Sequence, residues 1–183
     1  MPQDAAALYD LARITYTAAF GHSMSAADLE AHLANHLSLE RMSEMIDNDT
    51  FLLACSAEEI VGFVQFGVSH LHEQELISST AFAIHPSDRE IRRLYVLASH
   101  QNQGIGSLLM EAALNHPCLI NHNIFLDVWE ENPGAQRFYG RYGFEKVAEK
   151  QFSVGSGAET GVDFIMRRLS SESLRYDQQT RQE

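Results

Sequence analysis

A polar, glycine-containing segment follows a run of apolar residues near the middle of the chain. Residues 94–97 read LYVL, and residues 98–107 read ASHQNQGIGS. The pattern predicts a strand that ends at this run and a helix that begins near Gly104. The first N–H groups of a helix have no partner inside the helix and lie at the positive end of its dipole. Because glycine allows a ligand to approach the backbone closely, the segment is typical of a phosphate-binding turn.

Two other nucleotide-binding motifs do not fit this segment. A dinucleotide fingerprint requires a third glycine where the spacing gives Leu109, and a Walker loop requires a lysine followed by serine or threonine, which the segment lacks. Both motifs are therefore excluded. A purely structural turn stays open as the alternative to a phosphate site.

A second pattern, N-x-x-A-x-x-F-Y-x-x-x-G-F, begins at Asn132. It lies within residues 127–144, which read DVWEENPGAQRFYGRYGF. Together with Q-x-x-G-x-G at residues 101–106, it resembles the GNAT superfamily of acetyl-CoA-dependent N-acetyltransferases. The motif core covers residues 90–144, and the expected order of elements matches that superfamily over residues 5–169.

A narrower resemblance is carried by residues 93–97, 128–130 and 152–166. These stretches are similar to the PaiA-type spermine/spermidine N-acetyltransferases within the superfamily. The chain departs from the family pattern at its N-terminus, where the usual first strand is missing or very short. This departure concerns the edge of the sheet and not the cofactor motifs.

The resemblance implies an acetyl-CoA site formed by both patterns. Backbone groups of residues 94–96 would pair with the pantetheine arm, and the amide of Val96 would polarise the thioester carbonyl. Residues 101–107 would hold the pyrophosphate, and Asn132 would reach the pantetheine. Arg141 would meet a phosphate of coenzyme A or lie in solvent as a helix-end charge. The implied cofactor-binding residues are Leu94, Tyr95, Val96, Gln101, Asn102, Gln103, Gly104, Ile105, Gly106, Ser107, Asn132, Ala135, Tyr139 and Arg141.

Three residues are candidates for catalysis: Tyr139, Glu90 and Asp127. Tyr139 would protonate the departing thiolate, since the reference pKa of a phenol is near 10 and that of a thiol near 8.5; packing beside Phe138 is the alternative. An alkylammonium must lose a proton before it attacks, and Glu90 and Asp127 match positions where family members carry a carboxylate base. Each could equally be a strand-end charge. Direct transfer without an acyl-enzyme is expected.

Nine histidines raise the question of a metal site. His70 and His72 are two residues apart, so on a strand their side chains would lie on the same face. This spacing suits a pair of metal ligands. The surrounding HLHEQE sequence precedes Ser78-Ser79-Thr80, however, and is typical of a polar loop. We therefore expect no metal. Glu73 and Glu75 in the same segment are an alternative set of groups for binding an amine.

The expected elements begin with three helices, and strands interspersed with two further helices follow. Helical spacing predicts a helix over residues 5–20, a second capped by Ser25 and a third that starts at Ser38. Strands are expected over residues 50–55, 60–68, 90–97, 123–128, 144–154 and 161–169, helices over 104–116 and 132–142, and hairpin turns at 57–59 and 155–157. This order predicts an α/β (α+β) GNAT-like fold, a predominantly antiparallel mixed sheet of about six strands with helices on both faces.

Length and composition set the remaining expectations. The 183 residues fit a single acetyltransferase domain over 1–169 and a polar C-terminal tail over 170–183. No apolar run is long enough to span a bilayer and the start lacks a secretory signal, so we expect a cytoplasmic protein without a membrane partner. The net charge of −12 disfavours nucleic acid as a partner. Cys55 and Cys118 are expected to be small buried hydrophobes. Both a monomer and a homodimer stay open.

Three functions compete on this basis. The leading one is direct acetyl transfer from acetyl-CoA to a primary amine of a small molecule, such as the polyamines spermidine and spermine. The second is acetylation of a protein or peptide, and the third is a non-catalytic regulator that binds coenzyme A. The presence of Tyr139 and of both candidate carboxylates argues against the third.

Overall fold

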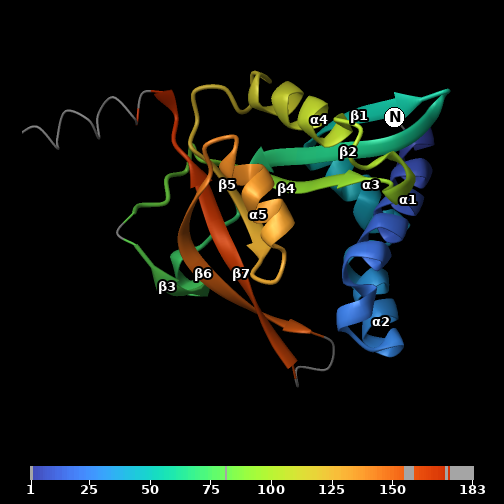
Figure 1. Ribbon diagram of the computed structural model, residues 1–183, viewed down its shortest axis with the longest axis horizontal. Helices are drawn as coiled ribbons and strands as arrows, with labels where there is room; N and C mark the ends of the chain where they lie inside the picture. Colours follow the sequence, from blue (N-terminus) through green and yellow to red (C-terminus); the bar gives the residue numbers. More distant parts are fainter. Residues whose placement is uncertain (1, 81, 155–158, 172, 174–183) are drawn as a thin grey trace, which may run out of the picture. The chain divides into compact units, whose positions relative to one another are not determined.

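The computed structural model describes residues 2–80, 82–154, 159–171 and 173 (Figure 1). The elements follow along the chain as α1 (Pro2–Phe20), η1 (Gly21–Ser23), α2 (Ala26–His36), α3 (Leu39–Asn48), β1 (Thr50–Ser56), β2 (Glu59–Val68), η2 (Glu73–Glu75), β3 (Leu76–Ser79), β4 (Arg89–Val96), η3 (Ala98–His100), α4 (Ile105–Leu114), β5 (Ile124–Trp129), α5 (Pro133–Gly140), β6 (Glu145–Val154) and β7 (Glu159–Arg168). Each expected helix and strand is present, with boundaries within a few residues of the prediction. None of the described residues forms a strand ahead of α1.

Seven strands form one sheet in the order β1-β2-β4-β5-β7-β6-β3. The pairs β1–β2, β5–β7 and β3–β6 are antiparallel, and β4–β5 is parallel. The long strands β6 and β7 can be followed side by side in Figure 1. The predicted mixed, predominantly antiparallel sheet is confirmed, with seven strands in place of about six.

The additional strand is β3, to which the sequence analysis assigned no element. The polar loop predicted just before it, over residues 70–75, contains no strand. Leu76 pairs with Lys150 and Ser79 with Ala148 of β6, and the amide of Thr80 donates a hydrogen bond to the Val147 carbonyl at 2.8 Å. The sequence analysis missed β3 because a short edge strand pairs through its backbone and shows little side-chain patterning. Leu76, packed against the neighbouring apolar core, is its apolar anchor.

Residue contacts divide the chain into two compact units. The described residues of unit 1 fall within Met1–Phe66, Arg93–Leu114 and Ser153–Glu159, and those of unit 2 within Gly67–Arg92, Asn115–Phe152 and Thr160–Glu183. Each unit has its own hydrophobic cluster. The cluster of unit 1 includes Leu8, Leu11, Leu33, Leu37, Met42 and Phe63, and that of unit 2 includes Leu71, Phe125, Val147, Ala148 and Ile165.

In unit 1, helices cover both faces of β2. Phe63 packs with residues of α1, α2 and α3 on one face. A Cβ added to the neighbouring Gly62 would lie 3.3 Å from Leu109 of α4. Because successive residues of a strand point to opposite faces, α4 lies on the face away from α1–α3. The predicted arrangement of helices is confirmed in this part of the sheet.

Two helix caps and a tight turn that the sequence predicted are present in the structure. Ser25 Oγ accepts a hydrogen bond from the backbone three residues ahead at 3.1 Å, and Ser38 Oγ does the same at 3.2 Å, so both serines cap helices. Ala57 and Glu58 have φ angles of 47° and 73°, which suit the tight turn between β1 and β2.

Three residues, Cys55, Cys118 and Ser170, differ in exposure from what the sequence predicted. Cys55 and Cys118 are exposed and form no disulfide, because Cys55 lies at the end of the edge strand β1 and Cys118 in a surface turn. Ser170, where the tail was expected to begin, is only 5% exposed, and its amide donates to Asn123 Oδ1 at 3.0 Å. Most of the expected tail and the predicted turn at 155–157 lie outside the described residues.

Candidate active site

The predicted phosphate-binding turn lies in unit 1, between β4 and α4. Two residues of the turn are left-handed, Asn102 with a φ angle of 59° and Gly104 with a φ angle of 84°. A Cβ added at Gly104 would meet no atom within 4 Å, so the space beside it is open. The turn therefore reverses the chain sharply and directs the backbone into the first turn of α4.

Free backbone N–H groups line this turn. Among the described residues, no hydrogen bond occupies the N–H groups of residues 102–107, whereas the next amide, of Leu108, donates to the Gly104 carbonyl at 3.0 Å. Unpaired amides at a helix N-terminus attract anions through their hydrogen atoms and through the helix dipole. The geometry is thus suited to a phosphate or diphosphate group.

Two glutamine side chains brace the turn from within. Gln101 Nε2 donates to the Val96 carbonyl at 3.0 Å, and Gln103 Nε2 donates to the Ser99 carbonyl at 3.1 Å. Both residues were predicted to bind the cofactor. Their side-chain amides hold the loop's own carbonyl groups and so stabilise the turn, while the backbone N–H of Gln103 is among the free amides.

The end of β4 is held tightly against β2. The Leu97 amide donates to the Val61 carbonyl at 2.9 Å, and a Cβ at Gly62 would lie 2.8 Å from the Tyr95 carbonyl oxygen. Only glycine fits there without displacing the β4 backbone. The register between β4 and β5 comprises Arg89 with Ile124 and Glu90 with Phe125. Residues 94–96, predicted to pair with pantetheine, lie beyond that register.

In unit 2, α5 carries the second sequence pattern. Asn132 Oδ1 accepts a hydrogen bond from the Ala135 amide at 3.0 Å, which makes Asn132 the N-cap of the helix. Tyr139 is half-buried between Phe138 and Phe144, with ring centroids 5.4 and 6.1 Å away. The predicted packing beside Phe138 is therefore present, and it fixes the direction of the tyrosine ring.

Arg141 follows α5 as its C-cap, and Gln136 lies in the first half of the helix. Arg141 is exposed, and its guanidinium lies 5.3 Å from the ring centroid of Phe138. Gln136 Nε2 donates to the carbonyls of Trp129 and Glu130 at 3.0 and 2.9 Å, which ties the start of α5 to the end of β5. The positive charge of Arg141 is thus available at the surface of unit 2.

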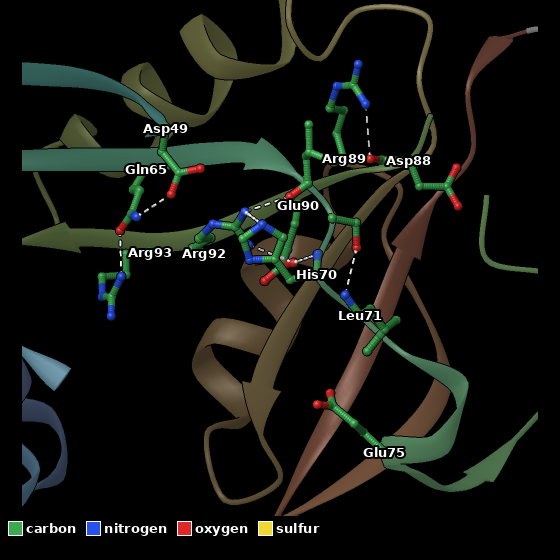
Figure 2. A network of polar contacts seen from close by, with 12 residues as sticks. Asp49, Gln65, His70, Leu71, Glu75, Asp88, Arg89, Glu90, Arg92 and Arg93 are labelled. Atoms are coloured by element: carbon green, nitrogen blue, oxygen red, sulfur yellow. Dashed lines mark hydrogen bonds and ion pairs between the residues drawn. The ribbon is translucent and has the colours of Figure 1, made fainter. Parts of the chain in front are cut away.

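Glu90 is held by its neighbours in unit 2 (Figure 2). Its Oε2 lies 2.9 Å from Arg92 Nη1 and accepts a hydrogen bond from the His70 amide at 2.9 Å. Arg92 Nη2 also donates to the Val68 carbonyl at 2.6 Å. Glu90 and Arg92 thereby fasten residues 68–70 to β4, and the Glu90 carboxylate is neutralised by a cation.

Asp127 lies in a different electrostatic setting. Its side chain is accessible to solvent, and no hydrogen bond or ion pair within the described part of the chain joins it. The pKa of Asp127 is raised to about 6, mainly by desolvation and also by the negative charges of Glu90 and Glu75, while Lys150 and Arg92 act in the opposite direction. A carboxyl with this pKa is largely ionised at neutral pH and is a stronger base than an ordinary aspartate.

Asp163 of β7 is a second such carboxyl, which the sequence analysis did not single out. Desolvation is the main cause that raises the pKa of Asp163 to about 7, and the charge of Asp127 adds to it. Lys150 opposes this rise, but its Nζ is also paired with Glu75 Oε2 at 2.7 Å. The available signal was a lone acidic residue inside the apolar strand sequence GVDFIM.

A buried polar chain in unit 1 was also missed (Figure 2). Gln65 is fully buried; its Nε2 donates to Asp49 Oδ2 at 2.7 Å, and its Oε1 accepts from Arg93 Nη1 at 2.6 Å. Burial lowers the pKa of the nearby His32 to about 4, with contributions from His36 and Arg93. A single glutamine within the strand sequence VGFVQFGV of β2 was the only signal.

The predicted site residues thus fall into two groups. Unit 1 brings together the end of β4 and the amides of residues 102–107. Unit 2 brings together Glu90 and Asp127 with the unpredicted Asp163 and Lys150, and it also contains Tyr139 and Arg141. Chemically, the first group can bind an anion and the second can accept a proton.

A model of the acetyltransferase (GNAT) family matches residues 5–144 of the chain. The chain belongs to the GNAT family. It is accordingly an N-acetyltransferase, and its cosubstrate is acetyl-CoA. An uncharacterized N-acetyltransferase in the pepI 3′ region of Lactobacillus delbrueckii subsp. lactis is 25% identical over 161 residues, which cover 86% of this chain and 87% of that protein.

Solved structures share the fold of this GNAT protein. The PaiA N-acetyltransferase of Thermoplasma acidophilum, solved in complex with coenzyme A, superposes with a TM-score of 0.65 at 19% identity, covering 92% of this chain and 94% of that one. The ribosomal-protein-alanine N-acetyltransferase of Brucella melitensis superposes with a TM-score of 0.63 at 16% identity, covering 92% and 96%. At these identities the likeness concerns the fold.

The described residues contain no group of three or more histidine, cysteine, aspartate or glutamate side chains placed to hold a metal ion. His70 Nε2 lies 3.3 Å from Arg92 Nη2, so this histidine faces a cation. None of the described helices has the length and apolar character needed to cross a membrane.

Proposed function

We propose that this GNAT enzyme transfers acetyl directly from acetyl-CoA to a primary amine of a small molecule, a polyamine such as spermidine or spermine, with Asp127 as the base. The observation that carries the proposal is the state of Asp127. Its carboxyl is accessible, lacks an ion-pair partner among the described residues and has a pKa raised to about 6.

The raised pKa of Asp127 lowers the free-energy cost of deprotonating the acceptor amine. An alkylammonium has a pKa near 10, so a base must take its proton before nitrogen can attack the thioester carbon. Each unit by which the pKa of the base approaches that of the amine lowers the free-energy cost of this transfer by about 1.4 kcal/mol. Asp127 is therefore a better proton acceptor than a carboxylate at its ordinary pKa.

Glu90 has a different role in this proposal. Arg92 Nη1 and the His70 amide already bind its Oε2, at 2.9 Å each. Accepting a proton would weaken both interactions, because a neutral carboxyl attracts an arginine far less than a carboxylate does. Glu90 thus acts as a structural anchor of residues 68–70, and its negative charge supports the basicity of Asp127.

The cofactor is held mainly by backbone groups in this proposal. The free amides of residues 102–107 receive the pyrophosphate of acetyl-CoA, and the backbone of residues 94–96 pairs with pantetheine. The Val96 amide polarises the thioester carbonyl, Asn132 reaches the pantetheine, and Arg141 meets a phosphate. These interactions orient the thioester and stabilise the oxyanion that forms on attack.

Tyr139 completes the proposed reaction as the acid. When the tetrahedral intermediate collapses, the carbon–sulfur bond breaks and the thiolate leaves with the bonding electron pair. The Tyr139 hydroxyl then donates its proton to the sulfur. The ring packing between Phe138 and Phe144 holds the tyrosine in one orientation.

The charge around Asp127 supports a cationic acceptor. The charges of Glu90 and Glu75 act on the titration of Asp127, and the charge of Asp127 acts on the titration of Asp163. The whole chain carries a net charge of −12. Such a field concentrates cations and repels anions. A polyamine, with several ammonium groups, gains most from this field, in line with the resemblance of residues 93–97, 128–130 and 152–166 to PaiA-type enzymes.

Release of the coenzyme A thiol, measured with a panel of acceptors, tests this function. The panel contains spermidine, spermine, simple monoamines, amino acids and peptides with a free N-terminus or lysine. We expect the highest kcat/KM with the polyamines. Turnover confined to peptides would replace the proposal by protein acetylation, and acetyl-CoA binding without release for any acceptor would overturn it.

A further inference from the structure

Asp163 and Asp127 lie on one face of adjacent antiparallel strands. In the register of β5 and β7, Asp127 is opposite Ile165 and Asp163 is opposite Trp129. Residues opposite each other share a face, and so do residues two apart along a strand. The two carboxyls are therefore diagonal neighbours on the same face, with Cα atoms roughly 7–8 Å apart as in other such pairs.

The cations nearest this pair form their ion pairs with other carboxylates. Glu90 is matched by Arg92 of β4, and Glu75 of η2 is matched by Lys150 of β6 at 2.7 Å. His70 faces Arg92, and Glu130 at the end of β5 adds a further negative charge near Asp163. Asp127 and Asp163 are joined by no ion pair within the described residues. The charge of Asp127 is the largest charge effect on Asp163 and raises its pKa. The charges that act on Asp127 are those of Glu90 and Glu75, which raise its pKa, and those of Lys150 and Arg92, which lower it.

Phe152 adds to the isolation of Asp163 from water. A Cβ at Gly161, two residues before Asp163 on the same face of β7, would clash with the ring of Phe152. The ring therefore lies directly over Gly161, two residues from Asp163 along this face. Desolvation is the largest cause of the raised pKa of Asp163.

We propose that Asp163 is a positioning residue for Asp127, and that the two carboxyls share the proton taken from the acceptor amine. This inference rests on the proposed function and adds a residue to it. In the step, an N–H bond of the ammonium breaks and its electron pair stays on nitrogen as the attacking lone pair. The proton forms an O–H bond to Asp127, and the resulting monoanionic pair is stabilised because like charges no longer face each other.

The titration of the pair agrees with this arrangement. The pKa values of about 6 for Asp127 and about 7 for Asp163 both exceed the ordinary value of an aspartate. Above pH 7 the pair is mostly dianionic and ready to accept a proton. Below that range it is already protonated, so the rate falls as the pH is lowered through about 7.

The test is the pH profile of kcat/KM for the Asp163→Asn variant with the best amine of the acceptor panel. Without the second charge, Asp127 ionises more readily, and the acid limb moves down by about one pH unit while the plateau rate falls severalfold. Asp163→Glu keeps the charge and stays closer to the wild-type limb. Glu145→Gln, which removes an exposed carboxyl from β6, leaves the profile unchanged. An unmoved acid limb in Asp163→Asn would overturn the inference.

A second readout separates this inference from the proposed function. Carbon-13 titration of the aspartate carboxyls in the free enzyme needs no acceptor. If the wild type acetylates no amine but Asp127 titrates at lower pH in Asp163→Asn, the pair exists and the proposed function fails. If amines are acetylated but neither the Asp127 titration nor the acid limb moves, the pair fails and the proposed function stands. Thermal melts of the variants confirm that each is folded.

Discussion

Arg92 holds Glu90 in an ion pair in which Nη1 lies 2.9 Å from Oε2 and the side chains are 12% and 16% exposed. The sequence left Glu90 and Asp127 equally eligible as the base. This pair distinguishes them, because it binds the Glu90 carboxylate as an anion while Asp127 keeps an accessible carboxyl without such a cation. The distinction leads directly to a difference between two variants.

Asp127→Asn is expected to lower kcat by at least about 100-fold, since loss of a general base costs two or more orders of magnitude. Glu90→Gln is expected to cost less than about tenfold, because it removes an anchor and one supporting charge. Steady-state kinetics with the best amine measures both, and Glu145→Gln on β6 controls for the loss of a surface carboxyl. A greater loss in Glu90→Gln than in Asp127→Asn would reverse the assignment.

Tyr139→Phe separates acid catalysis from packing. The substitution keeps the ring between Phe138 and Phe144 and removes only the hydroxyl. We expect kcat to fall by about 100-fold while the Kd of acetyl-CoA changes by less than about threefold. Kinetics and calorimetric titration give the two quantities. Equal turnover of variant and parent would leave Tyr139 with a packing role alone.

Gly106→Glu tests the backbone anion site. The added carboxylate lies in the first turn of α4, among the free amides of residues 102–107. It is expected to weaken acetyl-CoA binding by at least about tenfold, or about 1.4 kcal/mol, through steric obstruction and repulsion of the pyrophosphate. Asn35→Glu adds the same charge to the exposed surface of α2 and serves as the control. An unchanged Kd for Gly106→Glu would remove the turn from the cofactor site.

Gly62→Ala tests the close contact between β2 and β4. The new methyl group would sit 2.8 Å from the Tyr95 carbonyl and 3.3 Å from Leu109, so the β4 backbone or α4 must shift. We expect the free energy of unfolding to fall by about 1–3 kcal/mol in urea titration. Gly140→Ala, where a Cβ would meet no atom within 4 Å, is the matched control and should be neutral or slightly stabilising. Equal effects of the two would refute the tight fit.

Patterns along the chain predicted most of the fold. Ser25 and Ser38 mark helix starts because their hydroxyls cap local amides, and the glycine turn before α4 follows from φ angles that other residues rarely adopt. Such signals are local, so a single sequence contains them. Strand β3 was missed because its pairing depends on the β6 backbone, which no residue of β3 encodes.

The candidate site was predicted less completely, since its charges depend on partners distant in sequence. Glu90 and Asp127 look alike along the chain, and only the contact of Glu90 with Arg92 and His70 separates them. Asp163 becomes a neighbour of Asp127 through the register of β5 and β7. A register between strands that are far apart in sequence arises from the packing of the whole sheet.

Asp163→Asn should also change how stability depends on pH. The pKa of Asp163 rises from 3.8 to about 7 in the folded protein. Between these values the folded state binds more protons than the unfolded state, so this group's contribution to stability is present below about pH 4 and is lost as the pH rises through about 7. Asparagine carries no charge at any pH and removes that loss. We therefore expect the variant to raise Tm by a few degrees at pH 8 and to change it little at pH 4.5. Thermal melts across this range measure the difference, with Glu145→Gln as the reference for a carboxyl on an exposed part of β6. A Tm shift that is equal at both pH values would mean that folding does not disfavour the charged form of Asp163. It would also argue against coupling between Asp163 and Asp127.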